Sequence, residues 1–177
     1  MGKGTLIRGL LERMPGLELA VSATTRRPRE GEVDGRDYWF LSAEEFERRV
    51  AAGEFVEHAT YAGNRYGTLR SEVERPGRCI VLEIDLQGAR QVREALPDAV
   101  QIFIEPPSLD DLRARLERRG SDSPEQIRRR LAVAPAELAA KEEFAHRVVN
   151  DDVERALTEL VELAATMCPP RPGDATS

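Results

Sequence analysis

Residues Cys79–Gly88 read C-I-V-L-E-I-D-L-Q-G, and this segment is the clearest indication of the fold class. Its first six positions are nearly all apolar, which is typical of a β-strand covered on both faces. Helical and strand patterns alternate along the chain before and after it. A strand of this kind within such an alternation predicts an α/β fold, in which helices cover both faces of a parallel sheet.

The other expected elements follow from the hydrophobic pattern. Strands are expected over residues 17–21, 38–41, 55–61, 79–84, 100–104 and 148–150, and helices over 5–14, 44–52, 88–96, 109–119 and 153–167. A further helix follows Ser123, which can cap it, and Pro135 is expected to bend or divide that helix. Residues 23–76 contain more strand and less helix, which predicts an inserted β-rich subdomain.

Length, charge and composition limit the class of protein. A chain of 177 residues suits one compact α/β domain, and its net charge of −6 argues against non-specific binding to nucleic acid. No signal peptide and no run of about 18 apolar residues is recognisable, so neither export nor a membrane span is expected. Cys79 and Cys168 are expected to be reduced thiols, and the chain to be cytoplasmic.

The stretch Ser22–Tyr38 reads S-A-T-T-R-R-P-R-E-G-E-V-D-G-R-D-Y and contains the first candidate site. Arg26 and Arg29 lie on a loop that Pro28 stiffens, and a phenol follows at Tyr38. Because a guanidinium group matches two phosphate oxygens at once, this pattern is typical of a clamp for a small phosphorylated ligand. A solvated basic turn is the alternative interpretation.

Glu57 lies in the expected strand 55–61 and is a candidate for reading a base. One carboxylate can accept both N1–H and the 2-amino group of guanine, while a hydroxyl such as Thr68 or Ser22 donates to O6. Adenine has no N1–H, so such a site rejects it because the carboxylate is left unpaired. The alternative is a solvated strand carboxylate. Tyr66, in a glycine-containing turn expected over Asn64–Thr68, is either a second ligand phenol or a packing residue.

The chain opens with G-K-G-T at residues 2–5 before a helix, which resembles the last part of a phosphate-binding P-loop. There, backbone amides and a lysine hold phosphates, and a hydroxyl helps to hold Mg²⁺. The full G-x-x-x-x-G-K-[ST] pattern is incomplete, because its first glycine and the preceding strand are missing. Glu83 and Asp85 end the strand at 79–84, where carboxylates commonly hold Mg²⁺ or its waters; a helix cap is the alternative for Asp85.

Arginines gather on two adjacent expected helices on either side of Gly120–Ser123, at positions Arg115, Arg118, Arg119, Arg128, Arg129 and Arg130. A helix pair hinged here can close over a triphosphate, where guanidinium groups stabilise the transferred charge. Solvated helix faces with i,i+4 ion pairs are the alternative.

Together these features resemble the guanylate kinase family, whose members make GDP from GMP and ATP. The matching stretches are S-A-T-T-R-R-P-R-E-G-E-V-D-G-R-D-Y, G-E-F-V-E-H-A, G-N-R-Y-G-T, L-E-I-D-L-Q-G-A, F-I-E-P-P-S, L-E-R-R-G and V-V-N-D-D, in the family's order and spacing over nearly all of residues 1–165. The resemblance implies a P-loop NTPase-like three-layer αβα core over 1–22, 77–114 and 132–165. It also implies a GMP-binding subdomain over 23–76, a helical lid over 115–131 and a disordered tail over 166–177.

The resemblance implies ATP-dependent phosphorylation of GMP or dGMP in purine nucleotide metabolism, with Mg²⁺ as cofactor and neither nucleic acid nor membrane as a partner. It assigns GMP binding to Ser22, Arg26, Arg29, Tyr38, Glu57, Tyr66, Thr68 and Asp85. It assigns ATP binding to Gly2, Lys3, Gly4, Thr5, Arg115 and Asn150. Catalysis falls to Lys3, Arg119 and Arg130, and Mg²⁺ binding to Thr5, with Glu83 or Asp85 through water.

The chain departs from the family at its start and at Glu83, where an aspartate is more usual but the carboxylate is kept. Family members carry a buried strand and a loop like G-P-S-G-V before G-K-G-T. We expect such a strand and loop to be encoded in frame upstream of Met1, because loss of a central strand exposes two strand edges. A catalytically impaired GMP-binding or scaffold-type module is the alternative function. A kinase for another nucleoside monophosphate is a third, which Glu57 disfavours.

Overall fold

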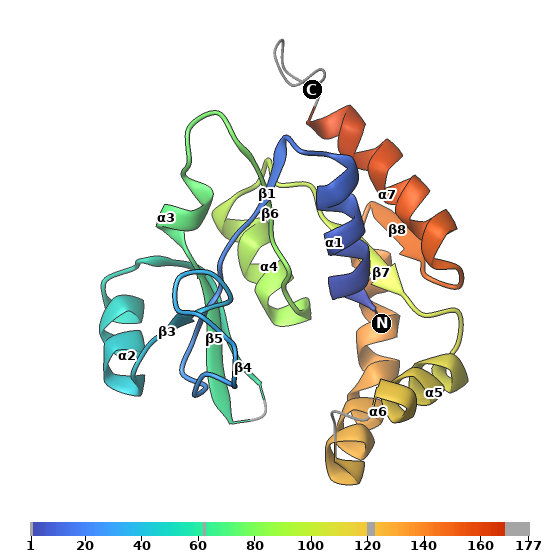
Figure 1. The fold of residues 1–177 in the computed structure, drawn as a ribbon, viewed down its shortest axis with the longest axis horizontal. Helices are drawn as coiled ribbons and strands as arrows, with labels where there is room; N and C mark the ends of the chain where they lie inside the picture. Colours follow the sequence, from blue (N-terminus) through green and yellow to red (C-terminus); the bar gives the residue numbers. More distant parts are fainter. Residues whose placement is uncertain (1, 62, 120–122, 169–177) are drawn as a thin grey trace. The chain divides into compact units, whose positions relative to one another are not determined.

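The computed structural model describes residues 2–61, 63–119 and 123–168 and divides into two compact units (Figure 1). Unit 1 combines Met1–Met14 with Val100–Ser177. Unit 2 is the continuous segment Pro15–Ala99. Each unit contains its own strands and helices.

Unit 2 contains a short parallel strand pair. β1 (Leu17–Leu19) lies beside β6 (Cys79–Val81), with Leu17 opposite Cys79. Within the described residues β6 pairs only with β1, and its side chains are half-buried. The prediction for residues 79–84 is therefore confirmed for the parallel pairing and wrong for the length and the burial on both faces.

A four-stranded sheet forms the other β-structure of unit 2. Its order is β3 (Trp39–Phe40), β2 (Ala23–Thr24), β5 (Asn64–Leu69) and β4 (Phe55–Tyr61), with β2 and β3 parallel and the other pairs antiparallel. Gly63, at φ +81°, lies between β4 and β5 in a conformation that glycine adopts without steric cost. The turn expected over residues 64–68 is thus wrong, because these residues form β5 and the turn precedes them.

One helix, α2 (Ala43–Ala51), supplies the aromatic residue at the centre of this sheet's core. Phe46 is fully buried and stacks on Phe55 with ring centres 4.5 Å apart. Ala23 and Leu69 complete the cluster. Burial of each large side chain contributes about 1.5–3 kcal/mol, so this cluster holds β2, β4 and β5 together.

Helix α4 (Leu86–Ala95) packs against β4. The Asp85 carboxylate caps the helix by accepting the N–H of Gly88 at 2.9 Å. The Gln91 side chain pairs with the backbone of His58, donating to its carbonyl at 2.8 Å and accepting its N–H at 3.1 Å. Because β4 is the last strand of its sheet within the described residues, these two bonds satisfy backbone groups at an open edge.

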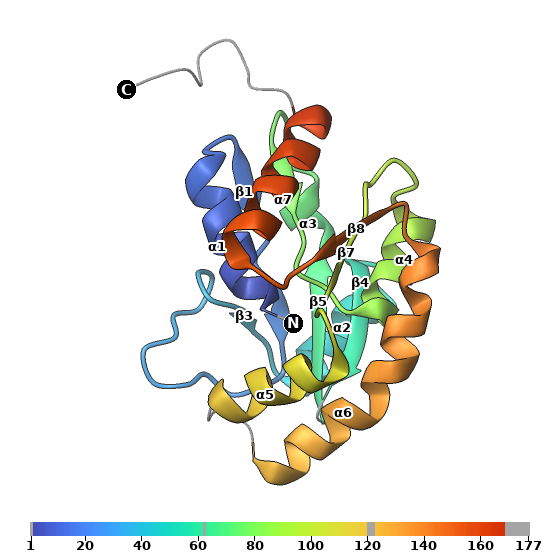
Figure 2. The ribbon, with the colours of Figure 1, turned by 90° about the vertical axis from the view of Figure 1, so that its right-hand side faces the viewer.

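Unit 1 contains a second parallel pair, β7 (Ile102–Glu105) beside β8 (His146–Val149). Helices α1 (Lys3–Arg13) and α7 (Val153–Met167) pack side by side in both views (Figures 1 and 2). Their buried face consists of Leu6, Leu10, Ala156, Leu157, Leu160 and Ala164.

Two further helices of unit 1, α5 (Leu109–Arg119) and α6 (Pro124–Ala139), pack on each other. Ser123 caps α6 as predicted, in a capping box with Gln126. The helix continues without interruption through Pro135, so the prediction that this proline divides it is wrong. Packing of α6 on α5 offsets the backbone hydrogen bond that a proline removes. A 3₁₀ turn, η1 (Ala140–Glu143), then leads to β8.

The strongest periodic patterns are confirmed with their predicted bounds: β4, α5 and α7. The one-turn helix α3 (Arg70–Val73) between β5 and β6 was not predicted. α7 ends at Met167, inside the range 166–177 predicted as a tail, and residues 169–177 lie outside the described part of the chain.

The structure corrects the expectation for the cysteines, since both Cys79 and Cys168 are disulfide-bonded. Among the helices of the described ranges, none has the length and apolar character that a membrane crossing requires.

Candidate functional site

The predicted phosphate clamp in unit 2 begins with Arg26. Its guanidinium group donates to Glu32 at 2.8 Å and to the backbone carbonyl of Arg27 at 2.8 Å. The guanidinium carbon lies 5.2 Å from the ring centre of Tyr38, within range of a cation–π contact. Because the Arg26 side chain is only 15% exposed, this is an organised cationic group and not a solvated turn.

Glu32 organises the loop around this arginine. Its carboxylate accepts the backbone N–H of Arg29 at 2.7 Å in addition to the bond from Arg26. The side-chain hydrogen bond lowers the pKa of Glu32 and raises that of Arg26, so both stay charged. Arg29 itself is exposed, which leaves its side chain accessible to a ligand.

Two phenol side chains lie next to the clamp. The rings of Tyr38 and Tyr66 are 6.2 Å apart in an edge-to-face arrangement. Burial raises the pKa of Tyr38, and the nearby negative charge of Glu83 contributes to the same shift. Tyr38 therefore remains a neutral phenol, whose O–H can donate to a phosphate oxygen.

The candidate base-reading carboxylate lies farther along the same sheet. Glu57 on β4 is opposite Thr68 on β5, and the threonine hydroxyl donates to its Oε1 at 2.7 Å. Glu57 is 5% exposed and Thr68 is 1% exposed, so the alternative of a solvated strand carboxylate does not describe this pair. Burial raises the pKa of Glu57. The ionised carboxylate still has lone pairs for further donors.

The first turn of α4 lies directly against Glu57. A Cβ atom at Gly88 would be 2.6 Å from the Oε2 atom of Glu57, so any larger residue at this contact displaces the carboxylate. The charge on Asp85 also contributes to the raised pKa of Glu57, which places the two carboxylates near each other. Asp85 caps α4, which confirms the helix-cap interpretation of this residue.

One connected row of side chains links the clamp to the buried acid. Arg26 contacts Tyr38, and Tyr38 contacts Tyr66. Tyr66 and Thr68 lie two residues apart on β5 and so on the same face, and Thr68 bonds Glu57. Cationic and phenolic groups at one end suit a phosphate, and the carboxylate at the other end suits a base with adjacent N–H donors.

The remaining predicted GMP residue, Ser22, is half-buried just before β2. Its backbone carbonyl accepts the N–H of Trp39 at 2.9 Å. Ser22 thus lies at the start of the loop that carries the two arginines.

The predicted phosphate loop of unit 1 is the N-terminus of α1. Gly2 is its N-cap at φ +75° and has no side chain to cap the helix, so the N–H groups of the first turn remain suited to an anion. Lys3 is half-buried in this turn, and Gly4 and Thr5 are exposed. A Cβ atom at Gly2 would lie 2.8 Å from the side-chain nitrogen of Asn150, which is 1% exposed. The structure therefore brings Gly2 and Asn150 together.

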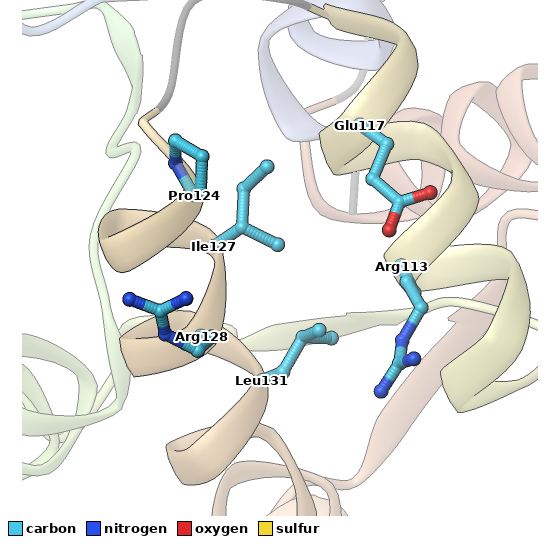
Figure 3. Close-up of a pocket in the computed structure, with 6 residues that line it drawn as sticks. All are labelled: Arg113, Glu117, Pro124, Ile127, Arg128 and Leu131. Atoms are coloured by element: carbon cyan, nitrogen blue, oxygen red, sulfur yellow. The ribbon is translucent and has the colours of Figure 1, made fainter.

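An open cavity of about 510 Å³ lies between α5 and α6 of unit 1 (Figure 3). Ile127 and Leu131 point from α6 toward α5 and form its apolar wall. The lining consists of Arg113, Glu117, Pro124, Ile127, Arg128 and Leu131.

The predicted arginines of this helix pair have different surroundings. Arg128 lines the cavity, whereas Arg115 and Arg130 are half-buried on α5 and α6. Arg129 forms an i,i+4 ion pair with Glu125, as the solvated-face alternative predicts. Arg119 is the last residue of α5, and its side chain lies outside the described part of the chain.

Sequence reasoning missed three residues that contact the row from Arg26 to Glu57 or the residues on either side of the loop Ser22–Tyr38. Glu32 was detectable as an acid three residues after Arg29 in an arginine-rich loop. Gly88 is the first residue of the helix expected over 88–96, and a glycine at a helix start carries no clear local signal of a close approach. Glu72, which accepts hydrogen bonds from Val21 and Trp39, has no local signal at all.

Comparison with known proteins gives one consistent result. The guanylate kinase family model matches residues 1–166. A guanylate kinase of Rubrobacter xylanophilus is 54% identical over 165 residues, covering 92% of this chain and 86% of the relative. One of Symbiobacterium thermophilum is 52% identical over 163 residues, covering 90% and 77%. The crystal structure of guanylate kinase from Anaplasma phagocytophilum matches with a TM-score of 0.74 at 32% identity, covering 94% of this chain and 82% of that one.

Proposed function

Since the chain belongs to the guanylate kinase family and is a nucleoside monophosphate kinase of the P-loop NTPase-like α/β fold, we propose that it transfers the γ-phosphoryl group of ATP to GMP. An oxygen of the GMP phosphate forms a bond to the γ-phosphorus, and the bond from that phosphorus to the β–γ bridging oxygen breaks. The products are ADP and GDP. Because dGMP has the same base and phosphate, it is accepted as well.

The buried pair Glu57 and Thr68 is the observation that supports guanine as the base. Guanine places two N–H donors side by side, and the Glu57 carboxylate has the acceptor capacity for both while Thr68 holds it in place. A base without N1–H leaves a buried carboxylate unpaired, which is costly. Ser22 directly precedes β2 and Asp85 directly precedes α4. In this proposal both residues help to orient the bound nucleotide.

The GMP phosphate is bound by Arg26, Arg29, Tyr38 and Tyr66 in this proposal. Arginines offer paired donors to phosphate oxygens, and the two phenols donate single hydrogen bonds. The ion pair with Glu32 keeps Arg26 in place before the ligand arrives. The clamp therefore orients the attacking oxygen, which is the main source of rate in phosphoryl transfer.

The ATP side of the proposal uses unit 1. The backbone of Gly2, Gly4 and the first turn of α1 receives phosphates, and Lys3 supplies a positive charge for the transferring group. Arg119 and Arg130 stabilise the charge that develops on the γ-phosphoryl oxygens. The remaining ATP contacts are those of Thr5, Arg115 and Asn150.

Magnesium fits the residues that are present. Within the described ranges no three acidic, histidine or cysteine side chains gather to hold a metal, and Mg²⁺ in such enzymes takes few protein ligands besides substrate phosphates. The Thr5 hydroxyl, exposed in the first turn of α1, would hold the ion. A role for Glu83 or Asp85 through water stays a prediction. When bound, the ion neutralises negative charge on the ATP phosphates.

A coupled assay of ADP production tests the proposal, with GMP, dGMP and AMP as acceptors. We expect GMP and dGMP to be used, and kcat/KM for AMP to be lower by about a thousandfold or more. Turnover of AMP at the rate of GMP would contradict the guanine assignment. Binding of GMP without turnover and without binding of an ATP analogue would instead support a scaffold-type module. With this activity the chain would serve purine nucleotide metabolism, and the cytoplasmic location stays a prediction.

A further inference from the structure

Unit 2 holds a second buried carboxylate that the proposed reaction does not use. Glu72 of α3 is 4% exposed. Its Oε2 accepts the backbone N–H of Val21 at 2.8 Å, and its Oε1 accepts the indole N–H of Trp39 at 3.1 Å. Arg75 forms an ion pair with the same carboxylate. Both oxygens are thus engaged, as a buried charge requires.

The two donors have a specific place in the chain. Val21 directly precedes the stretch Ser22–Tyr38, and Trp39 directly follows it. One carboxylate therefore fastens both ends of the loop that carries the phosphate clamp. A separate hydrogen bond, 2.9 Å long, runs from the backbone N–H of Trp39 to the backbone carbonyl of Ser22 and closes the base of the same loop.

Glu72 also joins the two chain connections of unit 2. One connection runs from β1 to β2 through residues 20–22, and the other runs from β5 to β6 through residues 70–78. Glu72 lies on the second connection and bonds Val21 on the first. The carboxylate thus fixes the place where the chain passes from the parallel pair to the four-stranded sheet.

We propose that Glu72 is a positioning residue for GMP binding: by fastening Val21 and Trp39 it holds the loop Ser22–Tyr38 in its binding conformation. This inference rests on the proposed function. A loop that is already ordered before the ligand arrives loses little conformational entropy on binding, so the ligand binds more tightly. Loss of Glu72 therefore weakens GMP binding, and leaves ATP binding and the rate at saturating GMP nearly unchanged.

The substitution Glu72→Gln tests this with little change of volume. The glutamine amide has one acceptor oxygen, whereas the N–H groups of Val21 and Trp39 each need an acceptor. One of these two hydrogen bonds is therefore lost. We expect the KM for GMP to rise about tenfold, with kcat and the KM for ATP within about twofold of the wild type. Glu74→Gln, an exposed acid two residues away, is the matched control and leaves all three values unchanged.

The substitution Trp39→Phe tests the same contact from the other side, because it removes the indole N–H and keeps a ring. It is expected to raise the KM for GMP, and the double variant with Glu72→Gln to raise it by less than the product of the two single effects. Trp39 is the single tryptophan of the chain, so its fluorescence emission reports the contact directly. The emission shifts in Glu72→Gln and stays as in the wild type in Glu74→Gln.

Two results would overturn the inference. One is an unchanged KM for GMP in folded Glu72→Gln; if circular dichroism shows that this variant is unfolded, the KM of Trp39→Phe decides instead. The other is an equal loss in kcat, KM for GMP and KM for ATP, which indicates general structural damage. A wild-type chain without GMP kinase activity would refute the proposed function instead, so the two failures are distinguishable.

Discussion

At the level of single residues, the proposed function makes guanine selectivity depend on the carboxylate of Glu57. Gln at this position keeps the volume and can still accept from Thr68, but it presents an NH₂ group to the two donors of guanine. A hydrogen bond to a charged group contributes about 1.5–3 kcal/mol. We predict that Glu57→Gln lowers kcat/KM for GMP about tenfold to a hundredfold and narrows the preference for GMP over AMP, as measured by the coupled assay.

The matched control for this prediction is Glu44→Gln, which neutralises an exposed acid of α2 in the same unit. Its kinetic constants are expected to equal those of the wild type. A Glu57→Gln enzyme that keeps the wild-type ratio of GMP to AMP activity would show that another group reads the base.

The same carboxylate predicts how GMP use depends on pH. Burial raises the pKa of Glu57 above the usual 4.5 of a glutamate, and in the proposed site guanine binds to the ionised form. As the pH falls through the raised pKa, the carboxyl becomes protonated and kcat/KM for GMP falls. We therefore expect the acidic limb of the pH profile to begin closer to neutrality than an exposed glutamate would give.

The control for the pH prediction is Glu57→Gln, measured over the same range. Because kcat/KM reports groups of the free enzyme, the acidic limb assigned to Glu57 disappears in this variant. An acidic limb that persists unchanged would assign the titration to a different group.

At the scale of elements, α4 acts on the site through a glycine. A Cβ atom at Gly88 would meet Oε2 of Glu57 at 2.6 Å and Cβ of Ile84 at 3.2 Å, so alanine forces the carboxylate to move. Alanine favours a helix by about 1 kcal/mol over glycine, which limits the loss of stability. We predict that Gly88→Ala keeps the fold by circular dichroism and lowers kcat/KM for GMP about tenfold or more.

Gln87→Ala, one residue earlier on the exposed side of α4, is the control for the glycine prediction. It is expected to leave the KM for GMP unchanged. Equal GMP kinetics in Gly88→Ala and the wild type would mean that displacing the Glu57 carboxylate does not affect GMP use. The close approach of Gly88 to Glu57 would then be unimportant for function.

The success of element prediction depended on whether the signal was local. β4, α5 and α7 were predicted with their bounds, since each has several residues of clear periodicity and a start or stop signal. β5 was mistaken for a turn because it contains Gly67, a residue typical of turns. Its strand conformation comes from pairing with β2 and β4, which lie elsewhere in the sequence. α6 was expected to bend or divide at Pro135, and it is not divided there because its packing on α5 is stronger than this local signal.

For the whole molecule, the sequence predicted which side chains could bind a phosphate and a base. It did not predict which residues hold those side chains in place. Arg26 and Glu57 have residue types and spacings that indicate phosphate and guanine, and the structure joins them through Tyr38, Tyr66 and Thr68. Glu72 bonds a residue 51 positions earlier in the chain, a contact that no local pattern encodes. The boundaries predicted for core, subdomain and lid stay predictions.

The division of the candidate residues between the units leads to a prediction for the two ligands. Every predicted GMP residue lies in unit 2, and every predicted ATP residue lies in unit 1. A ligand slows amide hydrogen exchange where it stabilises the local structure against opening. In hydrogen–deuterium exchange read by mass spectrometry, we expect GMP alone to protect residues 22–41 and 55–69. We expect a non-hydrolysable ATP analogue with Mg²⁺ to protect residues 2–6.

Each ligand serves as the control for the other, because GMP alone should leave the first turn of α1 unchanged. Protection by GMP with none at residues 2–6 under saturating ATP analogue would contradict a functioning phosphate loop and favour a module that only binds GMP. Protection at both places would support a kinase, since the proposed transfer uses the donor phosphates at the N-terminus of α1 and the acceptor phosphate at Arg26.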